Sequence, residues 1–78
     1  MRFTWDPRKA ASNDRKHGVS FEEAVSVFAD PLAILVEDAR HAERALIVGE
    51  SHAGRLLVTV FVEIHADEVR IISARRAT

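Results

Sequence analysis

The sequence predicts one α+β domain with the element order β-α-α-β-β-β-β, in which two N-terminal helices pack on one face of a mostly antiparallel sheet. Two helix-start signals precede residue 31, and three long apolar runs separated by short turns occupy the second half of the chain. Short connections between consecutive strands favour antiparallel hairpins. With 78 residues and no linker or internal repeat, the chain is expected to form a single domain over residues 1–78.

The first strand and the first helix follow from the residues around Asp6. Residues 2–5 are typical of a short strand. Asp6 is a favoured N-cap residue and is followed by proline, which is favoured at the first helical position, so a helix is predicted over Pro7–His17. Gly18 can adopt the left-handed conformation that commonly ends a helix.

The second helix is marked by Ser20 and Glu23, which have the spacing of a capping box. Asp30-Pro31 is expected to end this helix, because proline disfavours a helical conformation in the residue before it. The apolar residues between these two signals recur at helical spacing and predict one buried stripe: Phe21, Ala24, Val25 and Phe28.

The remaining strands are predicted from short runs rich in valine, isoleucine and leucine. A short strand is expected over residues 33–36 and a polar loop over residues 37–44. The three long strands are expected over residues 45–50, 55–64 and 69–75, joined by turns at 51–54 and 65–68.

Hairpin register predicts how these strands divide their side chains between the two faces of the sheet. A turn at residues 65–68 would place Ile64 opposite Val69. In that register the face toward the helices carries Leu56, Val58, Val60, Val62 and Ile64 with Val69 and Ile71. The other face would carry Arg55, Arg70 and Arg76 around Leu46, Val48, Leu57, Phe61 and Ile72. An apolar patch with an arginine rim is typical of a surface that binds a partner or a ligand.

Composition and charge exclude several classes of protein. The chain has no cysteine, which excludes disulfides and cysteine metal sites and fits a reducing compartment. Its N-terminus has no apolar signal segment and no run is long enough to span a membrane, so a cytoplasmic protein without membrane contact is expected. The net charge of −1 does not by itself indicate nucleic acid. Its distribution is uneven, with a net +3 over residues 1–18, −5 over 19–53 and +1 over 54–78.

The chain resembles the BrnT family of type II toxins. The resemblance covers nearly all 78 residues and rests on the segments WDPRKAASNDRKHGVSFEEAVSVFADP, HAERALIVGES, GRLLVTVFVE and VRIISARRAT. It implies a RelE-like fold, a metal-independent endoribonuclease activity without a cofactor, and neutralisation by a cognate antitoxin. Operator DNA would be contacted only indirectly, through the antitoxin. Members of the family generally continue into a short C-terminal helix, which this chain would lack.

Metal-free RNA cleavage needs a base for the 2′-OH, cations around the phosphate and an acid for the leaving oxygen. Arginine and lysine suit the phosphate, and histidine can transfer protons near neutral pH. The predicted catalytic residues are therefore Arg55, Arg70, Arg76, His17 and Lys16, and the predicted RNA-binding residues are Lys9, Arg75 and Asn13. No metal site is predicted, because His41, His52 and His65 lie in separate loops without the spacing of a metal site.

Structural roles are open for the same residues. Arg70 could pair only with Glu63, and Arg55 only with Glu50, across the hairpins. His17 could be a helix-terminal cation, and the helix face with Lys9 could be merely solvated.

Three functions therefore remain open at the level of the sequence. The first is a ribonuclease toxin with RNA as its substrate and an antitoxin as its partner. The second is a non-catalytic module that retains the antitoxin-binding surface. The third is a domain that dimerises through its open sheet face. The assembly would be either a homodimer or a toxin–antitoxin heterotetramer.

Overall fold

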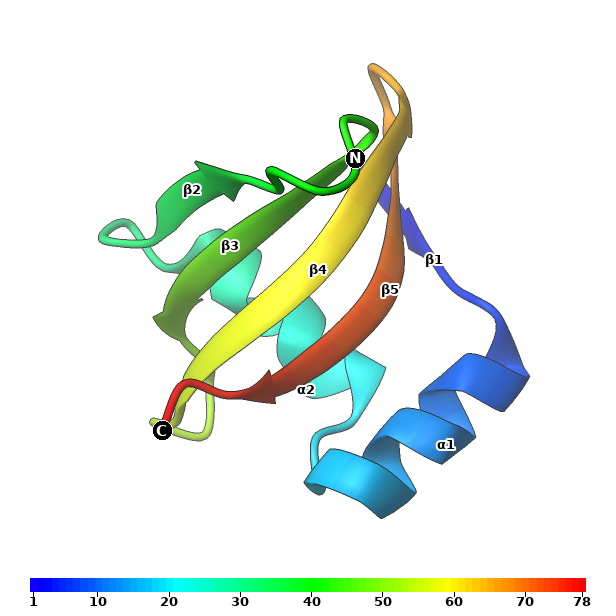
Figure 1. The fold of residues 1–78 in the computed structure, drawn as a ribbon. Helices are drawn as coiled ribbons and strands as arrows, with labels where there is room; N and C mark the ends of the chain where they lie inside the picture. Colours follow the sequence, from blue (N-terminus) through cyan, green and yellow to red (C-terminus); the bar gives the residue numbers. More distant parts are fainter.

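Five strands form one mixed sheet in the order β1-β5-β4-β3-β2 (Figure 1). The computed structural model describes all residues, Met1–Thr78. Strand β1 pairs with β5 in parallel, and the other pairs are antiparallel. This arrangement confirms the predicted α+β class and the predicted element order. The elements are β1 (Arg2–Thr4), α1 (Pro7–His17), α2 (Phe21–Ser26), the 3₁₀ turn η1 (Val27–Ala29), β2 (Ile34–Glu37), β3 (Arg44–Glu50), β4 (Leu56–His65) and β5 (Glu68–Arg76).

Both helices begin, and α1 also ends, at the residues that the sequence predicts. The Asp6 carboxylate accepts a hydrogen bond from the Arg8 amide at 2.9 Å, and Gly18 ends α1 with a φ of 66°. The Ser20 hydroxyl accepts a hydrogen bond from the Glu23 amide at 3.0 Å and caps α2. The second helix is shorter than predicted, because its last turn tightens into η1 before Asp30.

The core lies between α2, η1 and the sheet face that they cover (Figure 1). The ring of Phe28 packs between Phe3 and Phe61, with centroid separations of 4.9 and 5.1 Å. Trp5 contacts Phe21 edge-to-face at 5.9 Å and so belongs to the border of this core. These aromatic contacts join β1 and β4 to the second helix.

The predicted division of β4 between the two faces is wrong. Leu57, Thr59 and Phe61 are buried toward the helices, whereas Leu56 and Ile64 are about half exposed, at 52% and 48%. The row that faces the helices includes Thr59 and Glu63, whereas the opposite row is wholly aliphatic, so hydrophobicity favoured the wrong row. Two irregularities in the β4–β5 register also shift the pairing, so that Phe61 lies opposite Ile71 and not Ile72.

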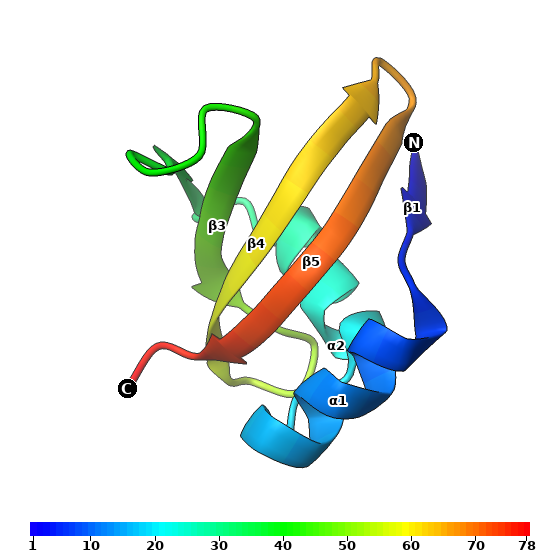
Figure 2. The ribbon, with the colours of Figure 1, turned by 45° about the vertical axis from the view of Figure 1, so that its right-hand side comes forward.

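No helix covers the sheet face opposite α1 and α2, as the two views show (Figures 1 and 2). Directly opposed residues of an antiparallel pair point to the same side, so the register identifies which side chains lie there. We call this surface the open face. Its aliphatic side chains are Ile34, Val36, Leu46, Val48, Leu56, Val58, Val60 and Val62, and its charged side chains include Arg44, Arg70 and Arg75.

None of the helices is long and apolar enough to cross a membrane.

Candidate nucleic-acid cleft

Strand β1 pairs only with the first residues of β5, and helix α1 lies beside the rest of that edge (Figure 2). Asn13 makes this connection through both atoms of its amide. Its Nδ2 donates to the Ala74 carbonyl at 2.8 Å, and its Oδ1 accepts from the Ala74 amide at 3.0 Å. The Nδ2 also donates to the Val19 carbonyl at 3.0 Å. One side chain thus satisfies backbone groups that a neighbouring strand would otherwise bond, and it is 6% exposed.

A cleft of about 220 Å³ opens on the outer side of this contact. Its α1 wall carries Lys9 and Lys16, two helical turns apart, together with His17. No carboxylate lines the cleft, and neither lysine makes an ion pair. We call it the α1–β5 cleft, and its lining residues are Lys9, Ser12, Asn13, Lys16, His17, Ile72 and Ser73.

The sequence predicted four of these residues, and the structure brings them together. Lys9, Lys16 and His17 are exposed and can reach a ligand, whereas the Asn13 amide is engaged with the backbone. Ser12 was missed, although its spacing of three residues from Lys9 places it on the same side of the helix. Ser73 was regarded only as a strand residue, because nothing in the sequence shows that α1 lies beside it.

The grouping of Arg55, Arg70 and Arg76 on one face is wrong. Arg70 lies opposite Val62 on the open face, whereas Arg76 lies opposite the buried Leu57 and therefore on the helix side. Arg76 follows Ala74 by two residues, so it extends the row of side chains that begins at the Asn13 contact. Arg75 lies on the open face, opposite Val58.

Arg55 is held inside the fold, just before β4. Its guanidinium makes a bidentate ion pair with Glu23, in which Nε donates to Oε2 at 2.9 Å, and its Nη2 donates to the Gly18 carbonyl at 3.0 Å. The predicted pairing of Arg55 with Glu50 is therefore wrong. This arginine connects the β3–β4 turn to α2 and to the end of α1.

The Glu23 carboxylate is buried and fully engaged. The hydrogen bonds from Arg55, more than that from the Ser51 hydroxyl at 2.7 Å, lower the pKa of Glu23 to about 2, against the opposing effect of desolvation. Glu23 is therefore ionised at neutral pH, and its charge neutralises Arg55 beside Gly18.

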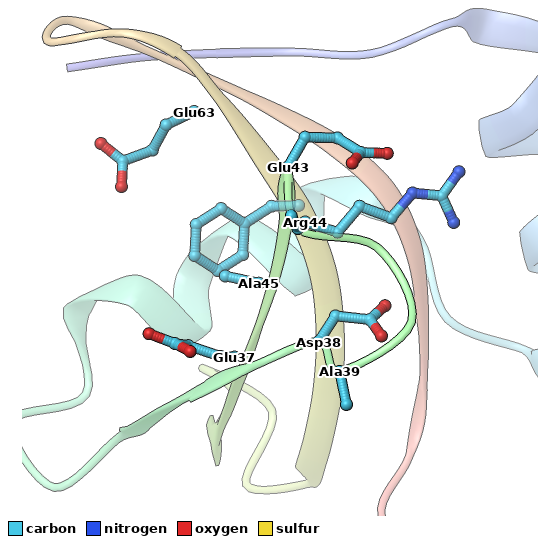
Figure 3. A pocket seen from close by; sticks show the side chains of 9 residues that line it. Glu37, Asp38, Ala39, Glu43, Arg44, Ala45 and Glu63 are labelled. Carbon is cyan, nitrogen blue, oxygen red and sulfur yellow. The ribbon is translucent and has the colours of Figure 1, made fainter.

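A second hollow has the opposite charge. It measures about 470 Å³ and lies at the end of the sheet where β2 and β3 are joined. Figure 3 shows Glu37 and Glu63 at one side of it and Arg44 pointing away from both. We call it the acidic pocket, and its lining residues are Glu37, Asp38, Ala39, Ala42, Glu43, Arg44, Ala45, Phe61 and Glu63.

The acidic pocket has four carboxylates and one arginine, so it disfavours a phosphate. The structure contains no group of three or more histidine, aspartate or glutamate side chains placed to hold a metal ion. Of these two hollows, the α1–β5 cleft is thus the one whose charge suits RNA.

The fold is that of a small α+β protein, and its α1–β5 cleft is lined by two lysines and a histidine. The model of the BrnT family, ribonuclease toxins of type II toxin–antitoxin systems, matches residues 5–78. The chain belongs to this family.

The fold is also that of a solved member. The structure is similar to the crystal structure of the ribonuclease toxin BrnT of Brucella abortus, with a TM-score of 0.83 and 24% sequence identity. The match covers 100% of this chain and 97% of the Brucella chain. A comparison with curated protein sequences found no match.

Proposed function

We propose that this protein is an endoribonuclease toxin that cleaves RNA in the α1–β5 cleft without a metal ion. The observation that carries the proposal is the lining of the cleft: two lysines, a histidine and two serines without any carboxylate, in a chain of a ribonuclease toxin family. Such a site can hold a phosphate through its charge and move protons through its imidazole.

In the proposed reaction the 2′-oxygen of a ribose attacks the adjacent phosphorus. Its proton passes to a base, the bond to the 5′-oxygen breaks, and that oxygen receives a proton from an acid. The products are a 2′,3′-cyclic phosphate and a free 5′-hydroxyl. Negative charge accumulates on the phosphoryl oxygens during this step, and nearby cations stabilise it.

The residues of the cleft suit these tasks unequally. Lys9 and Lys16 are placed to contact consecutive phosphates or one phosphate from two sides, since they lie two helical turns apart on the same wall. His17 is the imidazole of the cleft and is our choice for proton transfer. We assign Arg76 as a further phosphate contact, because it lies on the helix side of the sheet at the end of β5, beyond the residues that line the cleft.

Arg70 and Arg75 are not assigned to this step. Both lie on the open face, whereas Arg76 lies on the opposite, helix-covered side of the sheet. Arg55 is not assigned either, because Glu23 already neutralises its guanidinium.

The test is cleavage of a structured RNA by the purified protein in EDTA. We expect 2′,3′-cyclic phosphate ends from the parent protein and their loss in Lys16→Ala and His17→Ala. Arg15→Ala is the matched control, because Arg15 is exposed on α1 and does not line the cleft. Equal cleavage by the parent and by both cleft variants would reject this site, and cleavage that requires an added divalent ion would reject the metal-free mechanism.

We further propose that a cognate antitoxin is the partner that neutralises the protein, as in other type II systems. RNA is then the substrate, and operator DNA is reached only through the antitoxin. Family membership supports this partner. Co-purification of the product of a neighbouring small gene, with loss of RNA cleavage in the complex, is the expected result.

A further inference from the structure

The open face is an uncovered apolar surface of the kind that commonly marks a protein interaction site. It presents seven partly or largely exposed aliphatic side chains from β2, β3 and β4, whereas Val58 on the same face is 8% exposed. Ile34 is 63% exposed, Leu56 is 52% exposed and Val36 is 45% exposed. No helix covers this side of the sheet (Figure 2), and the β2–β3 loop borders it at Arg44 and Leu46 through Asp38, Arg40 and His41. The other side already has α2 and the aromatic core, so the open face is not needed for a second core layer.

The charges around these aliphatic side chains are predominantly positive. Arg44, Arg70 and Arg75 lie on this face, and none of them makes an ion pair. Two carboxylates share the face by register. The Glu68 carboxylate is paired with Arg2 at 2.7 Å. The other carboxylate, that of Glu50, makes no ion pair. A partner that covers this surface would therefore gain from carrying negative charge.

This combination argues against two other occupants. A second copy of the chain, placed face to face, would oppose one arginine rim to another, which is unfavourable. RNA would meet aliphatic side chains over β3 and β4 in the centre of the face, and the Ser73 hydroxyl, opposite Val60, offers its bases and phosphates a single neutral group. A protein surface with apolar side chains in its middle and carboxylates at its border matches both features.

The dimensions of the face suit a helix. Three neighbouring strands at about 4.8 Å spacing, with their side chains, span roughly 14 Å, and a helix with its side chains is about 10–12 Å wide. The backbone groups of β3 and β4 are already bonded within the sheet, so a partner must bind through side chains. An amphipathic helix does so and would complete a helix-sheet-helix sandwich.

We propose that the open face binds an acidic amphipathic helix of a partner protein, with aliphatic residues over β3 and β4 and carboxylates at Arg70 and Arg75. Identifying this helix as part of the antitoxin rests on the proposed function. The binding itself does not, because the side chains proposed to hold the helix, which are Arg70, Arg75 and the aliphatic residues over β3 and β4, do not line the α1–β5 cleft.

The experiment uses an 18-residue peptide as the probe, with leucine on one helical face, glutamate on the others and a fluorescein at one end. Fluorescence anisotropy measures its binding to the full chain. A second peptide with lysine in place of every glutamate is the charge control. We expect saturable binding of the leucine–glutamate peptide and no binding of the leucine–lysine peptide.

Variants locate the binding surface. Arg70→Glu with Arg75→Glu should raise the Kd at least about tenfold, which corresponds to ~1.4 kcal/mol. Arg8→Glu with Arg15→Glu makes the same change of charge on α1, outside the open face, and should change the Kd less than about twofold. Leu56→Ser tests the apolar part, and the thermal midpoint of each variant shows that it is folded.

Three results would overturn the proposal. One is equal binding of both peptides, and another is an unchanged Kd in the folded Arg70 and Arg75 variant. The third is displacement of the bound peptide by an RNA oligonucleotide that the same variant no longer binds, which would assign the face to nucleic acid. A protein that binds the peptide but cuts no RNA would reject the proposed function and retain this inference.

Discussion

The α1–β5 cleft and the acidic pocket are hollows of one small domain, yet they suit opposite ligands. The cleft combines Lys9, Lys16 and His17 from one helix with the edge of a strand that begins more than 50 residues later. The acidic pocket gathers residues 37–45 with Phe61 and Glu63 around a largely local turn. Size favours the acidic pocket, at about 470 Å³ against 220 Å³. Charge favours the cleft, and charge decides where a phosphate can bind.

The two regions also differ in how they are held. Asn13 joins the wall of the cleft to β5 with two hydrogen bonds to Ala74 and to the chain after α1 with a third, to the Val19 carbonyl. The Glu23–Arg55 pair also holds the end of α1, because Arg55 donates to the Gly18 carbonyl. The loop beside the acidic pocket is held mainly by its own turn, in which Asp38 accepts from the Arg40 amide. A site that stabilises a transition state needs the firmer support, because its charges must stay in place.

The largest expected effect is on catalysis. Lys16→Ala should lower the rate of RNA cleavage by about 100-fold, the scale on which removal of one stabilising charge acts at such sites. Glu63→Gln in the acidic pocket should leave the rate within about twofold. Single-turnover cleavage measured with both variants provides the comparison. The reverse order of effects would move the site to the acidic pocket.

The next effect is on stability. Asn13→Ala removes three hydrogen bonds and leaves the buried amide and carbonyl of Ala74 without partners, which should lower the free energy of unfolding by about 2–3 kcal/mol. Urea unfolding measures this loss. Asn13→Asp keeps the acceptor for the Ala74 amide but loses both donors, so its stability should not exceed that of the parent. A loss below about 0.5 kcal/mol in Asn13→Ala would mean that other contacts hold α1.

A third effect depends on pH. The pKa of the Glu23 carboxyl is about 2 in the folded protein, against an ordinary value of 4.5 that applies to the unfolded chain. The folded state therefore binds this proton less readily than the unfolded state. The contribution of the Glu23–Arg55 pair is therefore complete above about pH 4.5 and is lost as the pH falls toward 2. Allowing for solvent around Arg55, we expect a loss of roughly 2 kcal/mol, measured by urea unfolding across this range. In Glu23→Gln this part of the pH dependence should be absent, and a curve identical to that of the parent would contradict the assignment.

The smallest effect concerns long-range charge. Glu37→Lys with Glu63→Lys reverses the character of the acidic pocket without touching the cleft. RNA should bind about two- to threefold more tightly at low salt, because the acidic pocket repels the backbone at a distance. The gain should disappear at about 0.3 M salt, where such interactions are screened. Filter binding of RNA at two salt concentrations tests this, and a gain that persists in high salt would indicate a new direct contact.

Residues with local signals were predicted correctly. Asp6, Gly18 and Ser20 set the helix ends through bonds to residues within a few positions along the chain, so the sequence alone was sufficient. The hairpins joining β3, β4 and β5 followed from short polar turns between apolar runs. The lysines and the histidine of α1 were also recognised, because helical spacing places them on neighbouring turns.

Only the tertiary structure decided what these elements present to one another. Leu57 and Phe61 face the core although Leu56 and Val60 are equally apolar, because the fit of Phe61 against Phe28 and the irregular β4–β5 register determine the side. Nothing in the sequence shows that the Asn13 side chain bonds the backbone of Ala74, because the two residues are 61 positions apart. Arg55 reads as a free cation until α2 brings Glu23 to it. The sequence by itself thus determined the elements and the family, through short-range spacing. Contacts between residues distant in the sequence decided which side chains line the cleft and which are engaged in holding the fold together.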